Sequence, residues 1–149
     1  MTNFFVSPEG IVAVRLFLAL ILGSLIGIER TIAHKKAGLR TYALVSLASA
    51  LFVVVGQIVS AGLSSSVANP LIMAAPVISG IGFLGAGLII FHGSNLQGLT
   101  TAAGLWVAAA VGVATGFGLY LISLVAVILT LFALVVLWFL ERKIKDLTD

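Results

Sequence analysis

The sequence predicts an all-α integral membrane protein with about five transmembrane helices. Of its 149 residues, 61% are hydrophobic and only 9% are charged, whereas a soluble domain carries about 25% charged residues. The 100 residues from Thr41 through Leu140 contain no Asp, Glu, Lys or Arg, which a soluble domain of this size could not accommodate. A bilayer core about 30 Å thick is crossed by about 20 apolar residues. We therefore expect a single transmembrane domain over residues 1–149.

Short polar or glycine-bearing breaks separate the apolar stretches and set the expected helices. The first break, RTIAHKKAGLR at 30–40, is the only charged one, and uncharged breaks follow at 63–70, 92–99 and 116–118. The last span lacks glycine and has Tyr120 and Trp138 near its ends, which is typical of a lipid-facing helix with interfacial anchors. The expected spans lie near 11–29, 41–62, 71–91, 100–116 and 119–140.

The basic residues predict the orientation of the chain. Seven of the eight Lys and Arg residues lie in the break at 30–40 or after Leu140. Basic residues mark the cytoplasmic side, and an odd number of spans places both groups on the same side. We expect the N-terminus and the 63–70 loop outside and the C-terminus in the cytoplasm. The start of the chain lacks a basic n-region and a small-residue cleavage site, so we expect no signal-peptide cleavage.

A weak similarity at an offset of 60 residues suggests an internal repeat. GLRTYA at 38–43 aligns with GLTTAA at 98–103, and Gly27 falls on Gly87. The first two helices would then be repeated in parallel as the third and fourth, a plan known from transporters. Chance similarity in a chain rich in Ala, Gly and Leu is the alternative.

Glycines are concentrated in three of the expected spans. GIGFLGAG at 80–87 contains the pattern G-x-G-x-x-G, but it lies inside an apolar span, so a dinucleotide site is excluded. We expect a tight contact of this motif with the first or fourth span, because glycine lets helix backbones approach in lipid. A broken helix lining a cavity is the alternative. The glycines expected to pack helices, within the chain or across an oligomer, are Gly23, Gly27, Gly80, Gly82, Gly85, Gly87, Gly104 and Gly112.

Two charged residues fall within the first span. Arg15 lies about one turn from its outer end, where it either snorkels outward or contributes to a polar route. Glu29 is the only acidic residue in the first four spans and their connections. The 14 residues between them correspond to about 21 Å of helix, so they cannot pair. A charge at depth costs about 2.5–3.5 kcal/mol, so Glu29 needs a partner such as Arg30, Arg40 or a helix N-terminus.

The helix starts suggest how a site could form around Glu29. Thr41 and Thr100 or Thr101 are expected to be N-caps, which would direct two positive helix ends at the region of Glu29. Such a cluster could hold an anion, a proton or a cation, and an interfacial salt bridge without a ligand is the alternative. The candidate binding residues are Glu29, Arg30, Arg40, Thr41, Thr100, Thr101 and Arg15.

The same composition argues against metal, cofactor and enzyme chemistry in one chain. Mg²⁺ needs near-octahedral oxygen ligands, and the spans offer one suitable carboxylate, so a cage would need two Glu29 side chains across a dimer axis. The metal ligands therefore stay unassigned, and His34 and His92 are expected in solvent. No nucleophile, base and orienting acid can be combined. We expect no enzyme, no cofactor and no nucleic-acid binding.

Four segments together resemble the MgtC/SapB family of bacterial membrane proteins. They are GIER at 27–30, AGLRT at 37–41, GIGFLGAG at 80–87 and GLTTAAGLW at 98–106. The resemblance implies a multi-pass domain in the bacterial inner membrane that is linked to survival in low magnesium, acid resistance and virulence. Two departures stand out: we expect no soluble C-terminal domain of the kind that the best-known members carry, and Pro76 stands where an amide would be usual.

Two functional classes remain open. A small transporter or channel for magnesium or protons would use Arg15, Glu29 and the glycine motif as a polar route. A regulatory protein would instead present its glycine-rich helix faces and the basic segment at 30–40 to another membrane complex. Besides the lipid bilayer, the expected partners are a second copy of the chain, with a dimer favoured, and a membrane protein.

Overall fold

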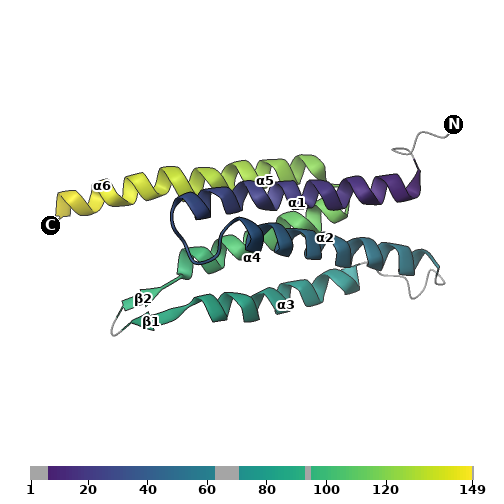
Figure 1. Ribbon diagram of the computed structural model, residues 1–149, viewed down its shortest axis with the longest axis horizontal. Helices are drawn as coiled ribbons and strands as arrows, with labels where there is room; N and C mark the ends of the chain where they lie inside the picture. The colour runs from purple at the N-terminus through teal and green to yellow at the C-terminus, as the bar shows by residue number, and fades with distance from the viewer. Residues whose placement is uncertain (1–6, 63–70, 93–94, 149) are drawn as a thin grey trace.

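The computed structural model describes residues 7–62, 71–92 and 95–148. These residues form helices and one short hairpin (Figure 1). The elements are α1 (Pro8–Ile32), α2 (Leu39–Ala61), α3 (Leu71–Leu88), β1 (Ile90–His92), β2 (Asn95–Gln97), α4 (Leu99–Gly116), α5 (Tyr120–Phe132), the π-helical η2 (Ala133–Leu137) and α6 (Trp138–Thr148). The last three join into one long helix. The prediction of an all-α membrane protein is confirmed.

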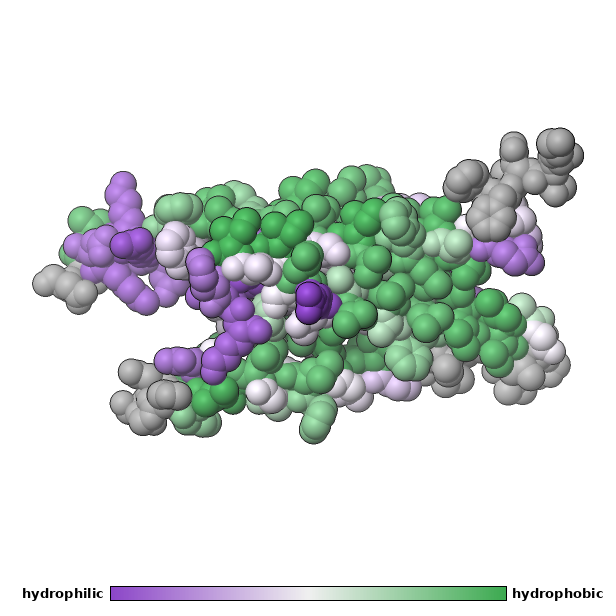
Figure 2. Space-filling view, viewed as in Figure 1, coloured by the Kyte–Doolittle hydropathy of each residue, from purple (hydrophilic) through white to green (hydrophobic). Residues whose placement is uncertain are grey.

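Successive long helices run in opposite directions along the long axis of the molecule (Figure 1). The α1–α2 turn at 33–38, the hairpin and the C-terminal end of α6 therefore lie together at one end, which we call the basic end. Hydrophilic residues gather there, while the middle of the bundle presents a hydrophobic surface (Figure 2). The two basic segments thus share one end of the bundle, as five passages require.

Within the described residues, four helices are long and apolar enough to cross a membrane: Pro8–Ile32, Leu39–Ala61, Leu99–Gly116 and Tyr120–Leu147. Helix α3 (Leu71–Leu88) has 18 residues and contains no charged residue, and the number of five spans stays a prediction. The structure corrects two boundaries. The helix expected to reach residue 91 ends at Leu88, because Ile90 and Phe91 pair with Gln97 and Leu96 in the hairpin. The last helix continues well beyond residue 140.

Helix α2 lies between α1 and α4, and glycines bring the three backbones together. A Cβ added at Gly23 would lie 2.6 Å from the Tyr42 carbonyl oxygen, and one at Gly27 would lie 2.7 Å from the Leu39 Cα. On the other side, a Cβ at Gly112 would lie 2.1 Å from the Ser46 carbonyl oxygen. Only a hydrogen fits at these positions, so the glycines of α1 and α4 define how closely α2 can pack.

The glycine motif of α3 does not make the tight contact that its sequence predicted. A Cβ added at Gly80, Gly82 or Gly87 would meet no atom within 4 Å, and one at Gly85 would meet the Ala102 Cβ at 3.7 Å. Helix α3 is continuous through the motif, so the broken-helix alternative is not observed either. The motif packs loosely because most of its glycines point away from the neighbouring helices. Its expected role in packing within the chain is therefore corrected.

The proposed repeat has one structural counterpart. Gly38 and Gly98, which align at the offset of 60, are the N-cap residues of α2 and α4. The aligned pair Gly27 and Gly87 differs, because Gly27 contacts α2 closely and Gly87 lies in open space. Of these two aligned pairs, the pair at the helix starts is alike and the other is not.

Topology gives the first testable prediction. Cysteines introduced singly at positions 9 and 35 lie at opposite ends of α1. Because the basic residues are retained on the cytoplasmic side, a membrane-impermeant maleimide added to intact cells should label position 9 and spare position 35. Labelling of position 35 alone would reverse the orientation, and equal labelling of both before cell lysis would contradict a spanning α1.

Candidate functional site

The basic end holds an ion pair between a partly buried carboxylate and a buried guanidinium. Both carboxylate oxygens of Glu29 accept hydrogen bonds from Arg30, one from Nε and one from Nη2. The Arg30 side chain is 4% exposed and that of Glu29 is 17% exposed. Neighbouring residues on a helix do not normally face each other. In the last turn of α1 the Arg30 side chain nevertheless bends back so that its guanidinium meets the Glu29 carboxylate. The charge of Glu29 is therefore compensated within α1.

Tyr42 connects the C-terminal part of α1 to α4. It is completely buried, and its hydroxyl donates a 2.9 Å hydrogen bond to the Thr101 carbonyl oxygen. Its ring fits against Gly104, where a Cβ would lie 2.8 Å from the hydroxyl oxygen. On the α1 side, a Cβ added at Gly27, one turn before Arg30, would lie 3.1 Å from the Tyr42 Cβ. We call Glu29, Arg30, Tyr42 and Thr101 the basic-end cluster. Sequence reasoning missed Tyr42, since a tyrosine near a span end is typical of an interfacial anchor.

The expected threonine caps are not formed. Helices α2 and α4 begin at Leu39 and Leu99, with Gly38 and Gly98 as N-caps that provide no side-chain hydrogen bond. Gly98 has φ 93°, and a Cβ there would lie 2.1 Å from the Leu88 carbonyl oxygen, so this position requires glycine. Helix α2 thus starts two residues earlier than the expected span and α4 one residue earlier, which places the threonines inside the first turn.

A threonine from α1 caps α2 instead. Thr31 Oγ1 accepts a 2.9 Å hydrogen bond from the Leu39 N–H and donates to the Gly27 carbonyl oxygen. Arg40 and Thr41 are exposed, and neither forms an ion pair or side-chain hydrogen bond with Glu29 in the described part of the chain. Thr100 is also exposed, whereas Thr101 is buried. Of the predicted site residues, Glu29 pairs with Arg30, and Thr101 contributes its backbone carbonyl to the Tyr42 hydrogen bond. Arg40 and Thr41 take part in neither contact.

The turn after α1 has the hydrogen bonds of a Schellman motif. The Lys35 N–H donates to the Arg30 carbonyl oxygen, and the His34 N–H donates to that of Thr31. His34 occupies the left-handed position with φ 54°, where glycine is more usual. This closed turn fixes where Lys35 and Lys36 leave the helix.

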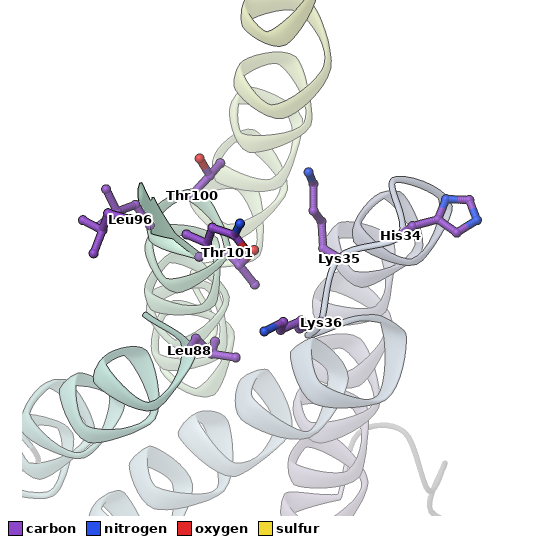
Figure 3. A pocket seen from close by; sticks show the side chains of 10 residues that line it. His34, Lys35, Lys36, Leu88, Leu96, Thr100 and Thr101 are labelled. Carbon is purple, nitrogen blue, oxygen red and sulfur yellow. The ribbon is translucent and has the colours of Figure 1, made fainter. Parts of the chain in front are cut away.

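These lysines line a pocket of about 490 Å³ at the basic end. The pocket, which we call the basic pocket, is bounded by residues 34–36, by Leu88 at the end of α3, and by residues 96–101 from β2 to the start of α4. Figure 3 shows the Lys36 amine directed toward Leu88 and Thr101, while the His34 ring turns away. No acidic residue lines the pocket, so the two lysines give its lining a net positive charge.

Arg15 lies toward the other end of the bundle and does not snorkel. Its Nη1 donates to the Gln57 side-chain oxygen at 2.8 Å and to the Gly116 carbonyl oxygen at 3.0 Å. Its Nε is buried and has no hydrogen-bond partner among the described residues. The guanidinium therefore links α1 to α2 and to the C-terminal end of α4, where the helix dipole favours a cation. Arg15 is not part of the basic-end cluster.

Replacing Arg15 with Met should destabilise the bundle by about 2–3 kcal/mol. The variant loses two hydrogen bonds from a charged group, each worth about 1.5–3 kcal/mol, and it also removes the cost of burying the unpartnered Nε. The measurement is the melting temperature in detergent. Lys143→Met, at an exposed position of α6, is the matched control and should leave melting unchanged. Equal melting of both variants would contradict a bridging role for Arg15.

The described residues contain no group of three or more His, Cys, Asp or Glu side chains that could hold a metal ion.

Comparisons with known proteins agree with the sequence resemblance. The profile of the MgtC family matches residues 16–143. Protein MgtC of Brucella abortus is 52% identical over 101 residues, which cover 68% of this chain and 40% of that protein. A protein of Escherichia coli K12 named putative magnesium transporter YhiD is 42% identical over 124 residues, covering 81% of this chain and 58% of that protein. Protein MgtC of Salmonella typhimurium is 42% identical over 132 residues, covering 89% and 54%.

The chain therefore spans between 40% and 58% of the length of these relatives. No solved structure matches it. The matched segment contains the basic-end cluster, the basic pocket and the glycines that surround α2.

Proposed function

The chain belongs to the MgtC family, and on that premise we propose that it acts without catalysis in magnesium homeostasis in the bacterial inner membrane, by regulating another membrane complex. One relative carries the name putative magnesium transporter, which supports the link to magnesium. The finer choice between regulation and transport depends on the charges at the basic end.

The positive basic pocket carries the argument for regulation. Lys35 and Lys36 line it, and no lining residue is acidic. Mg²⁺ binds oxygen ligands, commonly with one or two carboxylates, and like charges at close range repel it. Both oxygens of the nearby Glu29 carboxylate are already occupied by Arg30. The basic end therefore suits an anionic ligand or partner better than a bare divalent cation.

Transport is the second candidate, and the ion pair favours it. Charged residues within membrane helices often belong to ion or proton pathways, and Glu29 is such a residue. A transport role would require the Glu29–Arg30 pair to open during the cycle, so that the carboxylate becomes available to the ion.

Two measurements on the same chain distinguish the candidates. We expect it to restore growth of a deletion strain in low magnesium, and we expect proteoliposomes that contain it to take up no more Mg²⁺ than empty liposomes. Restored growth together with Mg²⁺ uptake above that of empty liposomes would overturn the regulatory proposal in favour of transport. Failure to restore growth would contradict the link to magnesium homeostasis itself.

The proposed partners follow from the same role. A regulator must bind a membrane protein, and the homo-oligomer expected from the sequence, with a dimer favoured, remains a prediction. Cross-linking in intact cells, followed by sizing of the products, tests both.

A further inference from the structure

We infer that the basic pocket binds a phosphate group. The proposal rests on the proposed function and deepens it, since it assigns a ligand class to the positive pocket that supports a regulatory role. Its test is a melting measurement, so its failure is distinguishable from a failure of the growth and uptake measurements. The volume of about 490 Å³ lies within the range of small-molecule sites, about 300–1,000 Å³. The pocket therefore has room for a phosphate together with the group that carries it.

The first argument is charge. Lys35 and Lys36 both line the pocket, and Figure 3 shows the Lys36 amine directed into it. The ion pairs found in the described part of the chain are Arg30 with Glu29 and Lys145 with Glu141, so neither pocket lysine is neutralised by a carboxylate there. Lysine ammonium groups are frequent phosphate ligands. Two such groups beside one cavity provide a net positive charge for a phosphate to offset.

The second argument is the opposite wall. Helix α4 begins at this wall, with residues 98–101 lining the pocket. The first N–H groups of a helix have no acceptor within the helix, and anions bind at such ends. Thr100 adds an exposed hydroxyl. Lysines on one side therefore face hydrogen-bond donors on the other.

The third argument is rigidity. On the α4 side, the Tyr42 hydroxyl donates a 2.9 Å hydrogen bond to the Thr101 carbonyl oxygen, and Gly98 packs closely against the Leu88 carbonyl oxygen. On the lysine side, the Schellman hydrogen bonds fix the turn that carries Lys35 and Lys36. Both walls are thus built before a ligand arrives, which reduces the entropy lost on binding.

A phosphate at this position could belong to a lipid headgroup or to a soluble compound. The lysines lie beside exposed leucines, among them Leu96 and Leu99, and such a mixed surface is compatible with both sources. The shared chemistry is the phosphate, and the experiment separates the sources.

The test measures melting of the purified full chain with two probes. In the lipid arm, nanodiscs of phosphatidylcholine alone are compared with nanodiscs that also contain phosphatidylglycerol. In the soluble arm, the chain in detergent is compared in inorganic phosphate and in chloride of equal ionic strength. At least one probe should raise the melting temperature. A rise with phosphatidylglycerol alone identifies a lipid headgroup, and a rise with inorganic phosphate identifies a soluble ligand.

Variants connect the rise to the pocket. The double variant Lys35→Gln and Lys36→Gln should lose more than half of the rise, whereas Lys143→Gln, which removes a lysine from α6 outside the pocket, should keep it. Gln97→Glu retains both lysines and places a carboxylate in the lining, so it should also lose the rise. This variant provides the test if the double variant folds poorly. No rise with either probe, or an equal loss in Lys143→Gln, would overturn the proposal.

Discussion

Replacing Gly112 with Ala is expected to destabilise the bundle by about 3 kcal/mol or more, at the upper end of the cost of overfilling a packed interior. The added Cβ would lie 2.1 Å from the Ser46 carbonyl oxygen and 2.8 Å from the Ser49 Cβ. A backbone carbonyl cannot rotate away as a flexible side chain can, so α2 and α4 must separate. The loss should appear as a large fall in melting temperature or as failure to purify a folded protein.

Gly82→Ala is the matched control, because the chemical change is the same and only the surroundings differ. A Cβ at Gly82 would meet no atom within 4 Å. Alanine favours the helix over glycine by about 0.8–1 kcal/mol, so this variant should melt at or above the temperature of the wild type. Similar effects of both substitutions would contradict the arrangement of α2 between α1 and α4. A marked loss in Gly82→Ala alone would show that α3 contacts a second copy of the chain.

Replacing Glu29 with Gln should cost about 3–5 kcal/mol, the range for removing one partner of a buried ion pair. The variant leaves the Arg30 guanidinium, whose side chain is only 4% exposed, without a compensating negative charge. Glu141→Gln is the control, because the Glu141 and Lys145 side chains are 65% and 70% exposed, and a surface pair contributes about 0–1 kcal/mol.

Growth in low magnesium, measured beside melting, then separates structure from function for Glu29. A variant that folds stably and fails to support growth assigns a functional role to the carboxylate. A variant that has a lowered melting temperature but supports growth at low temperature indicates that the Glu29–Arg30 pair has a structural role. Unchanged melting and unchanged growth would show that Glu29 is a solvated residue at a helix end, which contradicts the burial described above.

The fold was largely predictable because the membrane restricts the choices. Lipid requires each crossing segment to satisfy its own backbone hydrogen bonds, so apolar length translates directly into helices. Packing was less predictable. Gly112 and Gly82 both lie in glycine-rich apolar spans, yet only Gly112 meets another backbone. Sequence spacing shows that small residues share a stripe, but it does not show which neighbour the stripe faces.

The candidate site was predictable only where the partners are close in sequence. Arg30 follows Glu29 directly, so their pairing was among the expected outcomes. Arg15 instead binds the carbonyl of Gly116, 101 positions away, and no pattern in the sequence marks a backbone carbonyl as an acceptor. The threonine caps failed for a related reason: glycine also favours N-caps, and the close approach at Gly98 left no room for a side chain.

The open surroundings of the α3 glycines have a consequence for amide hydrogen exchange. Helices α1, α2 and α4 are interlocked through close backbone contacts, whereas Pro76 in α3 has no N–H and Gly80, Gly82 and Gly87 lie in open space. Elements with fewer close contacts open at a lower free energy than the global unfolding reaction. Amides of α3 should therefore exchange earlier than those of α2. Since Leu88 at the end of α3 lines the basic pocket, such an opening would reshape the pocket while the other three helices stay together.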